Sequence, residues 1–343
     1  MNLFFVKLKR NFIPLLFFVF MLCLIFFSKS NIIAVKGSLN IWINNVVPSL
    51  FPFFIATELL NNTNIPKQIG YLFNKIMRPL FNVPGIGAYA LFMGVVSGYP
   101  VGAKIVTNFR NNNLCTKEEA ERLITFTNNS GPLFILGTVG ILLFYDSSIG
   151  ILLLFTHILA CLSVGIIFRF WKSRTGYSRS IDVLPNNLTF NSLGEVISKS
   201  ILSAIKSIVL IGGFVVFFGI IISILKNAQL FNFLFILLSP VFNFLHLSTD
   251  FILPIFTGII ELTNGITMVS SVASKNLAIN VVIAAFLLGF GGISITLQVL
   301  SITSTSDISI RPYILGKLLH GVIASFYTFL IIYFIPYFNY LQI

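Results

Sequence analysis

Four short segments of this sequence combine glycine or proline with hydrogen-bonding side chains, each inside an otherwise apolar stretch. They are Ser97-Gly98-Tyr99-Pro100-Val101-Gly102, Asn128 to Pro132, Glu261 to Gly265, and Gly289 to Ser294. Such residues interrupt helices, and the N–H and C=O groups that an interruption frees need partners inside a membrane. Hydroxyls, amides and half-helix N-termini can hold a small polar or anionic solute. The pattern therefore predicts a ligand-binding site.

The residues that we expect to contact a substrate carry hydroxyl, amide or ammonium groups, or shape the backbone at the interruptions. They are Ser97, Gly98, Tyr99, Pro100, Gly102, Lys104, Asn128, Asn129, Ser130, Gly131, Thr263, Asn264 and Ser294. Lys104 either faces an anionic substrate or extends to the membrane surface. Only two acids fall within apolar spans. Glu58 lies near the end of its span, within reach of water, and Glu261 either binds a coupling proton or cation or orders the hairpin tip.

No motif of a hydrolytic or nucleotide-driven enzyme occurs in the sequence. G-x-S-x-G, H-E-x-x-H and the P-loop are all absent. Cys23, Cys115 and Cys161 have no ligand spacing, so we expect neither a disulfide nor a metal site. His157 and His320 each stand alone in an apolar stretch, which favours packing over a proton relay. We expect no catalysis and no cofactor.

The chain that carries these residues is far too apolar for a water-soluble fold. Of its 343 residues, 56% are hydrophobic and 9% are charged, and the mean hydropathy is +0.96. A soluble domain carries roughly 25% charged residues, and a membrane helix needs about 20 apolar residues. The composition predicts an all-α polytopic membrane protein and excludes soluble enzymes, DNA-binding domains and disordered chains.

Two halves of the chain repeat one order of segments: a span, an amphipathic segment, a broken hairpin and a broken helix. We expect these segments at 41–60, 65–81, 85–108 and 117–144, and again at 201–225, 230–245, 251–271 and 277–300. A shift of 164 positions places Phe92 and Gly94 on Phe256 and Gly258. Three crossings per half would invert the second half. We therefore expect two inverted repeats, each with a re-entrant helical hairpin and a broken transmembrane helix, as is typical of secondary transporters.

The domain boundaries follow from this repeat. We expect an N-terminal transmembrane helix in 1–37, the first repeat in 38–171, a cytoplasmic linker in 172–199 and the second, inverted repeat in 200–343. The linker is the one stretch whose polar composition resembles that of a soluble loop. Basic residues precede the first span, which we expect to remain uncleaved with its N-terminus in the cytoplasm.

The distribution of positive charge sets the expected orientation. The chain has 22 Lys and Arg against 10 Asp and Glu, a formal charge of +12, which we attribute to membrane topology and not to nucleic-acid binding. With the N-terminus inside and seven crossings, most basic residues lie on the cytoplasmic side, Lys317 among them, as the positive-inside rule requires. The outside residues are Lys29, Lys36, Lys226 and Lys275. The C-terminus is expected outside.

Two strings in the first half resemble a known family. Ser97-Gly98-Tyr99-Pro100-Val101-Gly102-Ala103-Lys104 and Thr127-Asn128-Asn129-Ser130-Gly131-Pro132 resemble the YlbJ-type sporulation integral membrane proteins, and Pro48 to Phe53 fits the same family. That family belongs to the nucleoside-recognition Gate domain group, which is distantly similar to concentrative nucleoside transporters. The resemblance covers about residues 41–336, and in the second half pattern carries it more than strings do.

The resemblance implies export of dipicolinate, a small aromatic dicarboxylate, toward the forespore during sporulation. It implies a multi-pass protein of the bacterial cell membrane, placed in the outer forespore membrane. Half-helix N-termini, Lys104 and the Asn and Ser donors suit an anion better than a nucleoside. Expected partners are the lipid bilayer, this anion, and a coupling proton or sodium ion, and homo-oligomerisation is left open. Two alternatives stand beside this prediction: a nucleoside transporter of the same fold, and a sporulation scaffold that transports nothing.

Overall fold

The computed structural model describes residues 3–173, 193–244, 248–273 and 276–342, and these ranges form helices with short connections and no strand. The predicted all-α fold is confirmed. Five described helices are long and apolar enough to cross a membrane by length and composition: Ser28–Asn61, Ser147–Phe168, Leu193–Asn227, Leu277–Thr303 and Arg311–Phe334. Residues 174–192 of the expected linker and Lys275 lie outside the described residues.

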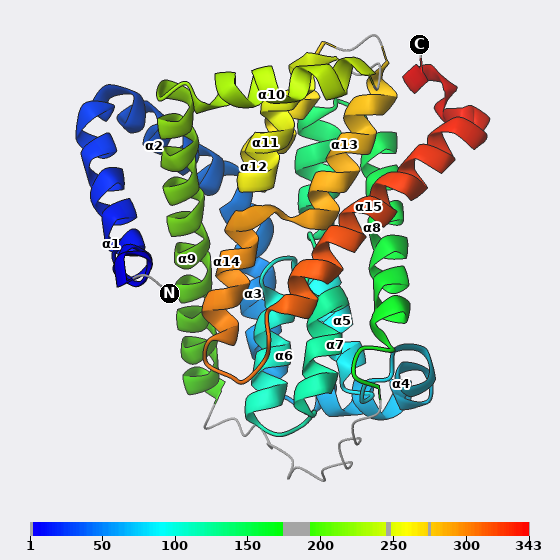
Figure 1. Ribbon diagram of the computed structural model, residues 1–343. Coiled ribbons are helices and arrows are strands. Elements are labelled where there is room, and N and C mark those ends of the chain that lie inside the picture. Colours follow the sequence, from blue (N-terminus) through cyan, green and yellow to red (C-terminus); the bar gives the residue numbers. More distant parts are fainter. Residues whose placement is uncertain (1–2, 174–192, 245–247, 274–275, 343) are drawn as a thin grey trace.

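The first half of the chain runs from α1 to α8 (Figure 1). Its elements are α1 (Leu3–Phe26), α2 (Ser28–Ile41), a π-helical turn (Trp42–Val46), α3 (Val47–Asn61), α4 (Ile65–Phe81), α5 (Gly87–Ser97), α6 (Val101–Asn111), α7 (Lys117–Thr127), a π-helical segment (Phe134–Leu143) and α8 (Ser147–Phe168). The span expected to begin at residue 41 begins earlier, because α2, the π turn and α3 join into one helix. The π turn ends two residues before Pro48, which has no backbone N–H to donate to a helical hydrogen bond.

The second half repeats the order of short and long helices. Its elements are α9 (Leu193–Asn227), α10 (Leu230–Phe244), a 3-10 turn (Thr249–Phe251), α11 (Ile252–Ile260), α12 (Leu262–Ser270), α13 (Leu277–Phe290), α14 (Gly292–Thr303), α15 (Arg311–Phe334) and a 3-10 segment (Pro336–Gln342). Every predicted interruption is present: between α5 and α6, after α7, between α11 and α12, and between α13 and α14.

The two hairpins enter the molecule from opposite ends. Figure 1 shows α4 lying across one end, with the α5–α6 hairpin rising from it, and α10 lying across the other end, with the α11–α12 hairpin descending from it. The expected inverted relationship between the halves is therefore present. Its consequence is that the two hairpin tips and the two helix breaks meet at mid-height.

Glycine permits the hairpins to pack closely on the structures that they face. A Cβ on Gly94 or Gly102 would lie 1.7 or 2.0 Å from the main-chain oxygen of Thr127, the last residue of α7. In the second hairpin a Cβ on Gly265 would lie 2.0 Å from Cα of Gly258. Side chains at these positions would separate the first hairpin from α7 and the two helices of the second hairpin from each other, so both close approaches depend on glycine.

The start of α7 follows the expected capping pattern. Thr116 Oγ1 accepts a hydrogen bond from the Glu119 N–H, and the Glu119 carboxylate accepts one from the Thr116 N–H. This capping box satisfies two amides that the helix leaves without partners. The acids in the first turn interact favourably with the positive end of the helix dipole. Together with the capping box they fix the residue at which α7 begins.

The buried charges differ from the expectation in one important respect. Lys317, predicted near the cytoplasmic face, is fully buried in α15. Charged residues of α7 are buried as well: Glu119 pairs with Arg78 at 2.7 Å, and Glu121 pairs with Lys172 at 2.9 Å. The positive-inside rule placed Lys317 on the cytoplasmic side. In the structure, α15 packs against α7, α8 and α13, and these helices cover the lysine.

Candidate functional site

The interrupted segments converge on one cavity of about 60 Å³. Tyr99 comes from the first hairpin tip, Ser130 and Gly131 come from the break after α7, and Glu261, Leu262 and Thr263 come from the second hairpin tip; Ile295 and Gln298 of α14, and residues of α3 and α9, complete the wall. The fourth interruption contributes through the first turns of α14. The predicted meeting of these segments is therefore found around a single hollow, with apolar surface beside a few polar groups.

Glu261 organises the second hairpin tip. Its carboxylate accepts hydrogen bonds from the N–H groups of Thr263 at 3.1 Å and Asn264 at 2.8 Å, and from the Asn264 side-chain amide at 2.7 Å. It thereby caps the N-terminus of α12. Of the two expected roles, this geometry supports the ordering of the tip, while binding of a coupling ion by Glu261 stays a prediction.

Tyr99 connects the first hairpin to the second half. Its hydroxyl donates a hydrogen bond of 3.0 Å to the carbonyl of Leu288, near the end of α13. The hydroxyl of Ser130 lies near this phenol, yet within the described chain it makes no hydrogen bond of ordinary geometry. Ser130 therefore brings to the cavity wall a buried hydroxyl that contacts the Tyr99 phenol without a well-aligned hydrogen bond.

The two asparagines of the α7 break hold the backbone more than they face the cavity. The Asn128 side-chain amide donates to the Tyr313 hydroxyl at 3.1 Å, and its oxygen accepts from the Ala103 N–H at 3.4 Å. The Asn129 amide donates to the Phe126 carbonyl at 2.9 Å. Neither asparagine lines the cavity. They fix the position of Ser130 and Gly131, which do.

A buried basic cluster behind the α7 break was not predicted. Lys317 Nζ donates to the Asn128 carbonyl at 3.1 Å and lies 5.0 Å from the ring centre of Tyr99. It also lies 3.2 Å from Nδ1 of His320. The rings of His157 and His320, expected to stand alone, are 4.4 Å apart. The i, i+3 spacing of Lys317 and His320 on an apolar helix is the feature of the sequence that could have indicated the cluster.

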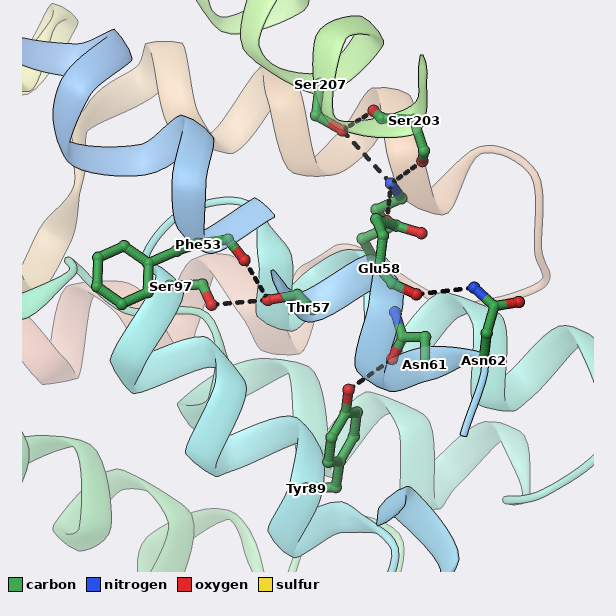
Figure 2. A network of polar contacts seen from close by, with 10 residues as sticks. Phe53, Thr57, Glu58, Asn61, Asn62, Tyr89, Ser97, Ser203 and Ser207 are labelled. Atoms are coloured by element: carbon green, nitrogen blue, oxygen red, sulfur yellow. Dashed lines mark hydrogen bonds and ion pairs between the residues drawn. The ribbon is translucent and has the colours of Figure 1, made fainter. Parts of the chain in front are cut away.

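Lys104 lies apart from the main cavity, in the polar network that Figure 2 shows around Glu58. Its ammonium forms an ion pair with the Glu58 carboxylate and donates to the hydroxyl of Ser203 at 2.8 Å. These three residues belong to α6, α3 and α9. Lys104 and Glu58 line a second, smaller cavity of about 10 Å³. The predicted contact of Lys104 with a substrate stays a prediction, and its observed partner is Glu58.

The remaining predicted residues divide between the cavity and its supports. Ser97 exchanges a hydrogen bond of 2.8 Å with Thr57 (Figure 2), and Gly98, with φ of +80°, packs against Gly131. Thr263 lines the cavity, whereas Ser294 faces Gln298 at 3.5 Å and contributes through it. Supports that do not line the cavity are Ser97, Gly98, Pro100, Gly102, Asn128, Asn129, Asn264 and Ser294.

Comparison with known proteins decides the family. Residues 43–170 match the family described as "Gate: Nucleoside recognition". The sporulation integral membrane protein YlbJ of Bacillus subtilis (strain 168) is 34% identical over 313 residues, covering 87% of this chain and 76% of that protein. The chain belongs to the YlbJ family of sporulation membrane proteins. No solved structure matches it.

The residues that match the family model include those of the first half of the chain that line the cavity. The Gate region begins in the π turn before α3 and ends just after α8, so it contains the first hairpin and the α7 break. It therefore includes Tyr99, Ser130 and Gly131 of the cavity wall. Lys317 and Glu261 lie outside it, in the half that completes the site of this YlbJ-family chain.

Proposed function

We propose that this YlbJ-family protein is a secondary transporter of a small anionic solute, with dipicolinate exported toward the forespore as the first candidate. The observation that carries the proposal is the convergence of two hairpin tips, the α7 break and the first turns of α14 on one cavity. Backbone interrupted at membrane depth is expected where it borders a solute pathway. The protein would act as a carrier and would break no bond.

Two helix N-termini favour an anion at this site. The helices α6 and α14 begin beside the cavity wall, and neither is capped by the side chain of its own N-cap residue, Pro100 or Gly291. In the first turn of α6, the Asn128 side chain accepts the Ala103 N–H. Helix N-termini present N–H groups and the positive end of the helix dipole to a negatively charged group. The hydroxyl of Ser130, which has no well-aligned hydrogen bond within the described chain, adds a donor on the cavity wall. A dicarboxylate with an aromatic ring would also use the apolar wall.

A nucleoside is the rival substrate, because the matching family is described by nucleoside recognition. Nucleosides are uncharged, so they would gain less from the helix N-termini.

The orientation with the N-terminus in the cytoplasm and the place in the outer forespore membrane complete the proposal. The orientation agrees with the predicted gathering of basic residues on one side, and the place in the forespore membrane is proposed from the sporulation family.

The test is uptake of labelled dipicolinate into liposomes that contain the purified protein, with unlabelled dipicolinate or uridine as competitor. Ser130→Ala should reduce affinity by about tenfold or more, because a hydrogen bond to a charged ligand contributes about 1.5–3 kcal/mol. Its folding should change little, since within the described chain this hydroxyl makes no well-aligned hydrogen bond.

Ser239→Ala is the matched control, because within the described chain that hydroxyl donates to the carbonyl of Phe235 on the same helix, α10, at an exposed position. It should leave uptake unchanged. Uptake of labelled uridine and not of labelled dipicolinate, measured in the same liposomes, would assign the site to nucleosides. Absence of uptake of both solutes, with folded protein in the liposomes, would overturn the transport function.

A further inference from the structure

Lys317 and His320 lie one turn apart on α15, and their side chains meet in the interior of the molecule. Lys317 Nζ is 3.2 Å from His320 Nδ1, and both residues are fully buried. We infer that this pair binds a single exchangeable proton, which is the ion coupled to transport; the inference rests on the proposed transport function and names its coupling ion.

The hydrogen bonds of the pair leave room for one proton and not for two. His320 Nε2 faces the carbonyl of His157 at 3.0 Å, which can only accept, so Nε2 carries a hydrogen. Nδ1 is then free to accept from the Lys317 ammonium. A second proton on Nδ1 would place two cations in contact, which electrostatic repulsion opposes. The pair therefore alternates between one positive charge and none.

The surroundings stabilise the charged form without a carboxylate. Lys317 donates to the Asn128 carbonyl at the C-terminal end of α7, where the helix dipole favours a cation. Its ammonium also faces the ring of Tyr99. No ion pair joins Lys317 to an acid within the described chain. Loss of the proton would thus leave no buried negative charge behind.

The titratable groups around the pair are few. On the packed helices they are His157 and Cys161 of α8 and Tyr313 of α15, with Tyr99 from the hairpin tip; α13 carries none, and the charged residues of α7 occupy its first two turns, from Lys117 to Arg122. His157 Nε2 accepts the Ser130 N–H at 3.3 Å, and its buried Nδ1 has no hydrogen-bond partner among the residues that the structure describes. His157 is therefore fixed as a neutral neighbour.

The proton on Lys317 is linked to the cavity through two residues that line it, Ser130 and Tyr99. Charged Lys317 holds the carbonyl of Asn128, two residues before the cavity-lining Ser130, and it faces the cavity-lining Tyr99. When the proton passes to water, Nζ becomes a neutral amine, and both the charge-assisted hydrogen bond and the cation–π contact are lost. Proton occupancy therefore biases the position of the hairpin tip and of the break, which is what coupling requires.

The same geometry argues against a metal cation at the break. A sodium ion at the break would use the Asn128 carbonyl oxygen as a ligand. That oxygen already accepts a hydrogen bond from the Lys317 ammonium. An ammonium tethered to α15 supplies the positive charge, and only its proton has to move. Transport should accordingly respond to a pH gradient and not to a sodium gradient.

The experiment compares two modes of transport in proteoliposomes that contain the full chain. Accumulation of dipicolinate is driven by an imposed pH gradient without sodium, and exchange of labelled for unlabelled dipicolinate is measured at equal pH. Lys317→Gln and His320→Gln should each lose gradient-driven accumulation by at least tenfold while exchange persists. Lys226→Gln, at an exposed lysine at the end of α9, is the matched control. The histidine variant keeps the test decisive if the lysine variant does not fold.

The outcomes separate the coupling site from the transport function. Wild-type exchange without any effect of the pH gradient, or variants that still accumulate solute, would overturn the proton site. A wild-type protein that exchanges neither dipicolinate nor uridine would overturn the transport function instead. The ¹⁵N NMR signals of labelled histidine in nanodiscs need no solute. A changed pH response of His320 in Lys317→Gln supports the shared proton, and an unchanged one contradicts it.

Discussion

The ammonium of Lys317 donates a hydrogen bond of 3.1 Å to the main-chain carbonyl of Asn128, so that α15 closes the break in α7. A carbonyl at the end of a helix lacks an intrahelical partner. Here a side chain far along the chain supplies that partner, in a fully buried environment. The break is therefore a tertiary feature, and its stability depends on the second half of the molecule remaining docked on the first.

Close packing of the first hairpin on α7 predicts a strong effect of one added methyl group. Gly94→Ala would place Cβ 1.7 Å from the Thr127 oxygen, so the backbone must move. Overpacking of this kind typically costs about 1–3 kcal/mol. We expect a lower unfolding temperature and weaker ligand binding. Gly213→Ala is the control, since nothing lies within 4 Å of its Cβ. Equal stability of the two variants would contradict the predicted contact.

The ion pair between Lys104 and Glu58 predicts thermodynamic coupling between α6 and α3. The lysine and glutamate side chains are 37% and 18% exposed, which places the pair between surface and buried cases. Removing either charge should destabilise the protein by about 1–3 kcal/mol. A double-mutant cycle of Lys104→Gln and Glu58→Gln measures the coupling by thermal unfolding.

Charge reversal distinguishes support of the fold from contact with the substrate. Lys104→Glu combined with Glu58→Lys should recover most of the stability lost in either single variant. Transport that recovers with it would assign Lys104 to positioning of the hairpin. Recovered stability without recovered transport would support the predicted contact between Lys104 and an anion. In the double-mutant cycle, stability losses of the two single variants that add up in the double variant would exclude coupling within the pair.

The positions of the first hairpin tip and of the α13–α14 break could be predicted from the sequence because their causes are local. Gly98, Pro100 and the glycines at 291 and 292 determine backbone conformation through their own geometry, and Gly98, Gly291 and Gly292 adopt positive φ. The order of segments and one constant shift then indicated inverted halves. A common cavity followed from matching the interruptions across the repeat.

The partners of the charged residues could not be predicted, since they depend on tertiary distance. Lys104 stands beside a hairpin tip in the sequence, yet in the structure its charge is opposed by Glu58 of another helix. Lys317 stands near a helix start, yet α7, α8 and α13 cover it. Sequence spacing gives the helical face of a residue but not what packs on that face.

The cap on the second hairpin predicts the result of Glu261→Gln. The carboxylate accepts two backbone N–H groups and one amide N–H, whereas an amide side chain can offer only one oxygen. Loss of such a cap costs about 0.5–2 kcal/mol. We expect lower thermal stability with an unchanged dependence of transport on pH and sodium. A changed dependence would instead assign a coupling ion to Glu261.

The link between Arg110 at the end of α6 and Asp307 in the α14–α15 loop predicts a pH effect on stability. Nε and Nη2 of Arg110 donate to the two Asp307 oxygens at 2.8 and 2.9 Å. These hydrogen bonds lower the pKa of Asp307 below its ordinary value. A lowered folded-state pKa stabilises the protein above the unfolded pKa of about 3.9, and this contribution disappears as the pH falls through the folded value.

Asp307→Asn should therefore flatten the fall in unfolding temperature between about pH 5 and pH 3. The difference from wild type at neutral pH should be about 0.2–1 kcal/mol, since the Asp307 side chain is 49% exposed and solvent screens the pair. Asp250→Asn is the control, because within the described residues that carboxylate accepts the Ser248 hydroxyl and forms no ion pair. High salt should reduce the effect of Asp307→Asn and leave the control unchanged. Parallel pH profiles for wild type and Asp307→Asn would show that this ion pair does not join the first hairpin to the second half energetically.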